Sequence, residues 1–67
     1  MKMQAVSSSN IAKVGYENMT LYIQFHSGGL YKYSGVPPEV YQQLMSASSH
    51  GKYFAYFIKD FYPYEKL

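Results

Sequence analysis

Tyrosine is in excess in this sequence, and its ring and hydroxyl group together suit the recognition of a flat, polar ligand. The chain has 9 tyrosines among 67 residues, which is more than a small core buries easily, because each buried hydroxyl needs a hydrogen-bond partner. Tyr31 and Tyr33 flank Lys32. These residues predict a sheet face on which a nucleobase stacks while lysine contacts phosphate. A tyrosine-rich core or a subunit interface would explain the same residues equally well.

A second candidate site lies where a serine precedes a predicted helix. The unpaired backbone N–H groups at the start of a helix suit an anion, and Ser49 and Gly51 would present them to a phosphate. Lys52 and Lys59 would add positive charge, one in the first turn and the other two turns further on. The alternative is a simple helix cap, in which Ser49 satisfies one N–H group and both lysines are solvated.

The residues that catalysis or metal binding would need are scarce. The sequence has no cysteine, 2 histidines and 4 acidic residues. His26 and His50 have no carboxylate or second histidine at metal-ligand spacing on the same element. The serines have no Gly-x-Ser-x-Gly turn and no orienting partner. We therefore expect no catalytic residue, no metal site and no cofactor.

Length and composition favour one small folded domain over residues 1–67. A chain of this size buries only about 60% of the surface that it exposes when unfolded. Without cysteine, neither disulfides nor a thiolate zinc site can support so small a core. Aromatic residues make up 19% of the chain and charged residues 15%, which excludes a polar disordered chain. We expect stability to come from packing or from self-association.

The net charge of +2 is weakly positive and comes from 6 lysines and no arginine. This charge is well below that of proteins that coat nucleic acid. Without arginine, the chain also lacks the planar guanidinium group that makes bidentate contacts to guanine. No apolar run approaches the roughly 20 residues that cross a bilayer, and the N-terminus lacks the apolar stretch of a signal peptide. We therefore expect a cytoplasmic protein without a membrane partner.

Alternating residues in the first half of the sequence predict an antiparallel β-meander. Leu21, Ile23 and Phe25 share one face of a strand, and strand candidates flank it at residues 11–16 and 30–33. These segments predict a small sheet of three or four strands.

The length of the turn before the last of these strands decides which way Tyr31 and Tyr33 point. A loop of two or four residues places both rings opposite to the face of Ile23 and Phe25, whereas a three-residue loop places them on that face. We favour a two-residue turn on Gly28–Gly29, because it keeps the polar face continuous.

Two short helices are predicted in the second half. Gly35–Pro38 ends the sheet, because proline cannot donate a ladder hydrogen bond, and Pro38 suits the first turn of a helix of about ten residues. A second helix follows the polar break at Ser46–Gly51 and ends before Pro63. Its apolar stripe has the spacing i, i+3, i+4 and i+7 and consists of Phe54, Phe57, Ile58 and Phe61. The predicted fold is therefore α+β, a small antiparallel meander followed by two short α-helices packed on one face.

Several segments, in their order and spacing, resemble the KTSC domain, a short module at the C-terminus of some lysyl-tRNA synthetases and a free-standing protein of bacteria and phages. They are Val6–Ile11, Val14–Tyr16, Tyr31–Tyr33, Gly35–Tyr41, Ser49–Phe54 and Ile58–Lys59. The resemblance runs from about Met3 to Tyr62 and implies a single KTSC-like domain. Its tyrosine-x-tyrosine motif and its association with a tRNA enzyme imply RNA binding, and no catalytic residue carries over.

The residues and the resemblance together predict a non-catalytic protein that binds a nucleotide-type, phosphate-bearing ligand. Tyr31 and Tyr33 would stack on the base or donate hydrogen bonds, and Ser8 and Ser9 would donate from the N-terminal loop. A free-standing protein of 67 residues also has the size of phage proteins that sequester nucleotide signals of host defence, and such a protein would act in the host cytoplasm. We expect a homo-oligomer with a pocket shared between subunits, because a domain this small has little room for a cavity of several hundred Å³.

Two other functions stay open at this point. An RNA-binding module, acting on single-stranded RNA or tRNA, would lose affinity steeply as salt rises. A protein–protein interaction module would show no affinity for nucleotides and would cover an exposed apolar patch with its partner. The low charge and the missing arginine favour a small nucleotide over RNA.

Overall fold

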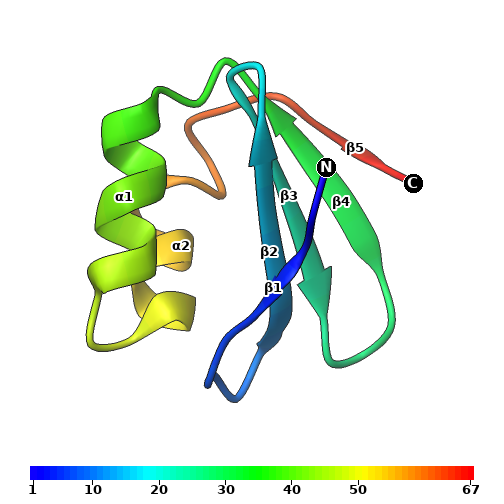
Figure 1. Cartoon of the computed structure of the whole chain (residues 1–67), viewed down its shortest axis with the longest axis vertical. Coiled ribbons are helices and arrows are strands. Elements are labelled where there is room, and N and C mark those ends of the chain that lie inside the picture. The colour runs from blue at the N-terminus through cyan, green and yellow to red at the C-terminus, as the bar shows by residue number, and fades with distance from the viewer.

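The computed structural model describes all residues from Met1 to Leu67. It contains a five-stranded antiparallel sheet with both helices over one face (Figure 1). The strands are β1 (Gln4–Ala5), β2 (Ile11–Glu17), β3 (Thr20–Phe25), β4 (Leu30–Ser34) and β5 (Tyr64–Lys66), and they lie in this order across the sheet. The helices are α1 (Pro38–Ser46) and α2 (His50–Phe57). The predicted α+β fold is confirmed.

The two edge strands raise the strand number above the predicted three or four. β1 has 2 residues and β5 has 3, and every residue of both strands is exposed. Such short, exposed strands show no alternation of buried and solvated positions, and this alternation is the signal that identifies a strand in a sequence.

The favoured two-residue turn on Gly28–Gly29 is wrong. The backbone N–H of Phe25 donates to the carbonyl of Gly29 at 2.9 Å, so the loop between β3 and β4 holds the three residues His26–Gly28. Gly28 has a φ of 107°, in the region that favours glycine and that a three-residue hairpin loop requires.

This loop turns the two tyrosines of β4 toward the helices. In the observed register, Tyr31 lies opposite Ile23 and Tyr33 lies opposite Leu21. Residues directly opposite in an antiparallel pair share a face, and Leu21 and Ile23 are fully buried beneath the helices. Tyr31 and Tyr33 therefore lie on the inner face of the sheet and not on the outer, polar face.

Helix α2 is shorter than predicted and ends at Phe57, with Ile58 as its C-cap at φ −123° and ψ −49°. Only half of the predicted apolar stripe is buried. Phe54 and Ile58 are in the core, whereas Phe57 is 56% exposed and Phe61 is 68% exposed. Neither α1 nor α2 is long and apolar enough to cross a membrane.

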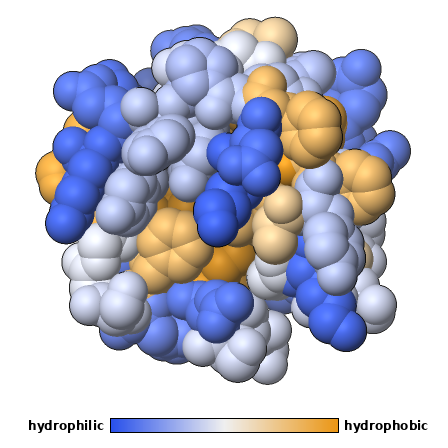
Figure 2. Space-filling view, turned by 180° about the vertical axis from the view of Figure 1, so that it is seen from behind, coloured by the Kyte–Doolittle hydropathy of each residue, from blue (hydrophilic) through white to orange (hydrophobic).

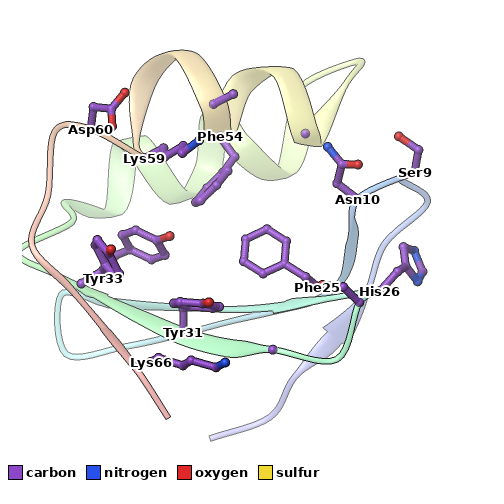
Figure 3. A pocket seen from close by; sticks show the side chains of 15 residues that line it. Ser9, Asn10, Phe25, His26, Tyr31, Tyr33, Phe54, Lys59, Asp60 and Lys66 are labelled. Atoms are coloured by element: carbon purple, nitrogen blue, oxygen red, sulfur yellow. The ribbon is translucent and has the colours of Figure 1, made fainter.

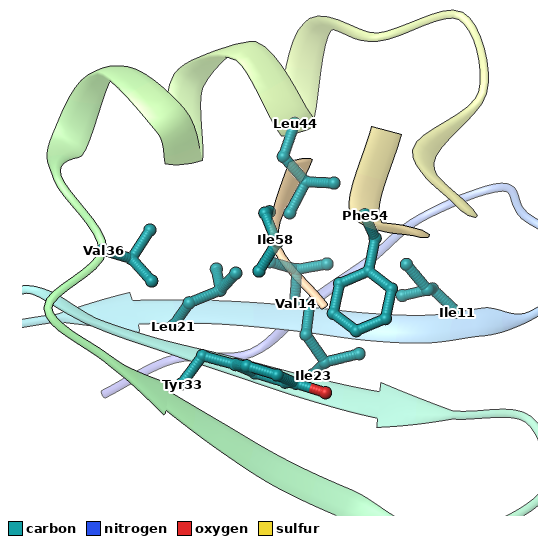
Figure 4. Packing of buried hydrophobic residues seen from close by; sticks show 9 residues of the cluster. All are labelled: Ile11, Val14, Leu21, Ile23, Tyr33, Val36, Leu44, Phe54 and Ile58. Atoms are coloured by element: carbon teal, nitrogen blue, oxygen red, sulfur yellow. The ribbon is translucent and has the colours of Figure 1, made fainter. Parts of the chain in front are cut away.

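The core lies between the sheet and the helices (Figure 4). Its buried members are Ile11, Val14, Leu21, Ile23, Tyr33, Val36, Leu44, Phe54 and Ile58. Burying a side chain of this size contributes about 1.5–3 kcal/mol. Leu44 of α1 and Phe54 of α2 face the strands, and this packing fixes α2 over β3 and β4.

Candidate ligand-binding site

A cavity of about 740 Å³ opens between the sheet and α2 (Figure 3). Its walls come from the loop before β2, the β3–β4 hairpin, α2 with the turn after it, and β5. Seen from behind, the molecule exposes a few apolar side chains among polar ones (Figure 2). The volume is within the range of sites for small molecules. A single chain therefore has room for a cavity of this size, which we expected only between two subunits.

Five aromatic rings line this cavity and contact one another in a closed circle. In order around the circle they are Phe25, Tyr31, Tyr64, Tyr33 and Phe54. Neighbouring centroids lie 5.3 to 5.9 Å apart, and the interplanar angles run from 33° to 80°. No pair of this aromatic circle stacks face to face, and all five rings line the cavity.

Three elements bring the rings of the aromatic circle together. Alternation along β4 places Tyr31 and Tyr33 on one face, and the pairing of β4 with β5 places Tyr64 directly opposite Tyr33. Phe25 ends β3, and Phe54 reaches down from the buried side of α2. Figure 3 shows the four rings of Phe25, Tyr31, Tyr33 and Phe54 directed toward the same space.

The three tyrosine hydroxyls of the circle find no partner in the protein. The tyrosines whose hydroxyls do donate to protein groups are Tyr16 and Tyr53. Tyr33 is only 4% exposed, yet no fully enclosed side-chain oxygen or nitrogen lacks a partner. The Tyr33 hydroxyl therefore reaches the open space of the cavity, where it is free to donate to a ligand.

Burial, followed in order of effect by the neighbouring Tyr64, Tyr31 and Asp60, raises the pKa of Tyr33 to about 12. At neutral pH the side chain is consequently an un-ionised hydroxyl. It can donate a hydrogen bond, but it cannot act as a general base, which needs a pKa near the working pH.

Charged side chains stand around the cavity. Lys59 and Asp60 follow α2, and Lys66 lies on β5. The ion pairs in the structure join Lys32 to Glu65 and the N-terminus to Glu17, each at 3.5 Å. Lys59 and Lys66 therefore have no carboxylate partner and can approach an anion in the cavity.

The structure brings most of the predicted site residues together. Ser9, Tyr31, Tyr33, Gly51 and Lys59 all line the cavity. A second hollow of about 290 Å³ adjoins it and is lined by Ser49 and Lys52 as well as by Ser9 and Gly51. Residues far apart in the sequence thus meet at the N-terminal end of α2.

Two of the predicted serines bind the protein itself. The Ser8 hydroxyl accepts hydrogen bonds from the backbone N–H groups of Asn10 and Ile11, at 3.3 and 3.2 Å, and Ser8 lines neither hollow. The Ser49 hydroxyl accepts from the N–H of Lys52 at 3.3 Å and so caps α2. The Ser49 hydroxyl therefore serves as a helix cap, which was the alternative interpretation of this residue.

Both histidines hold elements together. His26 Nε2 lies 2.9 Å from the Ser8 carbonyl and joins the β3–β4 hairpin to the N-terminal loop. His50 Nδ1 lies 2.8 Å from the Leu44 carbonyl and joins α2 to α1. No three histidine or acidic side chains are grouped so that they could hold a metal ion.

The sequence reasoning missed several residues of the cavity. Phe25 was on the predicted face of Ile23, and a three-residue loop would have placed it beside Tyr31. Phe54 was recognised, but as part of a core stripe only. Tyr64 and Lys66 lie on β5, whose three exposed residues carry no periodic signal.

Comparisons with known proteins agree on one family. The KTSC domain matches residues 7–62. A protein of Stutzerimonas stutzeri is 46% identical over 56 residues, which cover 81% of this chain and 79% of that protein. The lysine–tRNA ligase of Nostoc punctiforme is 43% identical over 61 residues, but these cover 88% of this chain and 11% of the ligase.

A crystal structure of a KTSC domain protein from Yersinia pestis has the same fold. It superposes with a TM-score of 0.96 at 43% sequence identity, over 98% of this chain and 96% of that one. At this identity and coverage the similarity extends to the whole sheet and both helices.

Proposed function

The chain belongs to the KTSC domain family, and we propose that it binds a small phosphate-bearing nucleotide without converting it. The observation that carries the proposal is the aromatic circle, because its rings line a cavity of about 740 Å³ and its tyrosine hydroxyls have no partner in the protein. Aromatic faces bind flat bases of any kind, and stacking contributes about 1–3 kcal/mol per base.

The polar groups of the cavity match the other parts of a nucleotide. The hydroxyls of Tyr31, Tyr33 and Tyr64 supply hydrogen bonds to the edge of a base or to a sugar. Lys59 and Lys66 supply positive charge for phosphate. An apolar cavity with a few polar groups that converge on it is the usual form of a small-molecule site.

The same residues support binding without turnover. The raised pKa of Tyr33 removes it as a base near neutral pH, and one ring nitrogen of His26 is engaged by the Ser8 carbonyl. A protein that holds a nucleotide and does not release products lowers its free concentration. We propose sequestration of a nucleotide signal as the biological use, which in a phage would act against host defence in the host cytoplasm.

A thermal-shift screen tests this proposal, because a ligand that binds only the folded state raises Tm. Linear and cyclic nucleotides are screened beside short single-stranded RNAs. We expect a small nucleotide to raise the Tm of the wild type, and the double variant Tyr31→Ala/Lys59→Ala to show no shift while circular dichroism reports an intact fold. The control variant Lys13→Ala removes an exposed lysine outside both hollows and should respond as the wild type does. The proposal fails if no nucleotide raises Tm or if the double variant binds normally.

RNA binding is the second candidate, and the similarity to a segment of a lysine–tRNA ligase favours it. Several lysines around the cavity would contact successive phosphates of a strand. For single-stranded nucleic acid, log K falls against log salt with a slope of about −0.7 per phosphate contact. A slope of several contacts together with affinity that rises with strand length supports RNA, and a shallower slope without that dependence on length supports the small nucleotide.

A further inference from the structure

We infer that the ligand is a dinucleotide whose first base packs against the rings of the aromatic circle and whose second base packs on Tyr56. This inference rests on the proposed nucleotide-binding function and extends it to the second hollow. The linking phosphate would cross the boundary between the two hollows at Gly51.

The two hollows form a continuous path along the start of α2. Both are lined by the same four residues, Ser9, Asn10, Gly51 and Ala55. From this shared boundary the larger cavity leads to the aromatic circle, and the second hollow leads to Lys52 and Tyr56. A ligand that enters the first at its open end can therefore reach the second without leaving the surface.

At this boundary α2 and the N-terminal loop approach each other closely, and Gly51 places no side chain between them. A Cβ atom at this position would lie 3.4 Å from Asn10 Nδ2 and 3.6 Å from Ser8 Oγ, so a side chain would occupy the space between α2 and the N-terminal loop. The glycines whose backbone requires a positive φ are Gly28 and Gly35. Gly51 lies in a helix, where glycine is unfavourable. We infer that glycine stands here because the position must have no side chain.

Tyr56 offers an unoccupied ring at the far end of the path. Its side chain is 65% exposed, makes no hydrogen bond within the protein and belongs to none of the aromatic pairs of the structure. Lys52, next to it in the second hollow, has no carboxylate partner. An exposed aromatic ring beside a free lysine is the arrangement that binds one more nucleotide of a chain.

Isothermal titration calorimetry compares each ribonucleoside 5′-monophosphate with the matching 5′-phosphorylated homodinucleotide. We expect the dinucleotide of the preferred base to bind about tenfold more tightly than the mononucleotide, since it gains one stacked base. Tyr56→Ala should reduce the dinucleotide to the affinity of the mononucleotide and leave mononucleotide binding unchanged. Phe57→Ala, an exposed neighbour on α2 outside both hollows, should change neither.

Gly51→Ala provides a second, independent variant. Its methyl group meets only ordinary van der Waals contacts, so the fold is kept while the boundary narrows, and we expect the dinucleotide to lose more affinity than the mononucleotide. Equal affinities of the two ligands, or a gain that survives Tyr56→Ala, would overturn the inference and leave the proposed function standing. Affinity that keeps rising from dinucleotide to trinucleotide and beyond would also overturn it, and absence of all nucleotide binding would remove both proposals.

Discussion

At the scale of single residues, the ring of Tyr33 belongs to the core, and its hydroxyl opens into the cavity. Its ring packs edge-on against Phe54 with centroids 5.3 Å apart, whereas its hydroxyl has no protein partner. Tyr33→Phe should therefore leave the free energy of unfolding nearly unchanged and lower nucleotide affinity about two- to tenfold, the value of one hydrogen bond. Calorimetric titration and urea unfolding measure the two effects.

Tyr16→Phe is the matched control for this prediction. The Tyr16 hydroxyl donates to the Val36 carbonyl at 2.6 Å, so its removal should destabilise the fold by about 1 kcal/mol and leave affinity unaltered. If Tyr33→Phe behaved as this control does, its hydroxyl would serve the fold and not a ligand.

The raised pKa of Tyr33 also predicts how stability depends on alkaline pH. The pKa is about 12 in the folded protein and 10.0 in the unfolded chain, so above pH 10 the unfolded state releases this proton first. The stability that the folded protein gains by keeping the Tyr33 hydroxyl un-ionised is complete below pH 10 and is lost as pH rises through 12. Urea unfolding at pH 9 and pH 11.5 should show a larger loss for the wild type than for Tyr33→Phe. Equal losses would contradict the assignment.

At the scale of elements, the parts of the fold that the sequence predicted are those with a strong local signal. The alternation of Leu21 and Ile23 identified β3, and Pro38 marked the start of α1, because each pattern reflects burial or backbone geometry within one element. The faces of Tyr31 and Tyr33 were predicted wrongly, since one residue in the loop reverses every side chain of the next strand.

The cavity could be predicted only in part for the same reason. Gly51 and Lys59 were recognised from the expected helix start, and Tyr31 and Tyr33 from their motif. Tyr64 completes the aromatic circle from β5, whose position depends on pairing with β4 and not on its own sequence. Such tertiary pairing leaves no periodic trace in three exposed residues.

The start of α2 gives a prediction about stability that is independent of any ligand. Ala at position 51 fits the helical backbone and restricts the unfolded chain, so Gly51→Ala should stabilise the protein by about 0.4–1 kcal/mol. Gly35→Ala is the contrasting control. A Cβ there meets nothing within 4 Å, but its φ is 76°, so this variant should be destabilised by about 1–2 kcal/mol. Chemical unfolding of both variants distinguishes the two effects, and a destabilised Gly51→Ala would show that the helix start is strained.

At the scale of the whole molecule, the cavity joins both ends of the chain. Its lining begins at Ser9 and ends at Lys66, so the site exists only when β5 has paired with β4 and the N-terminal loop has reached α2. The hydrogen bond from His26 to the Ser8 carbonyl holds the N-terminal loop to the β3–β4 hairpin. The ion pair between Lys32 and Glu65 joins β4 to β5. An exposed ion pair of this kind contributes at most about 1 kcal/mol, so ligand contacts to Tyr64 and Lys66 should help to hold β5 in place.

A cavity of about 740 Å³ within one chain also predicts the stoichiometry of binding. Every residue that we assign to the ligand comes from the same chain, so calorimetric titration should give one nucleotide per chain, whatever the subunit number. The homo-oligomer expected from the sequence stays a prediction, for which light scattering on the purified protein supplies the mass. A ratio of one nucleotide for two chains would show instead that subunits share the site.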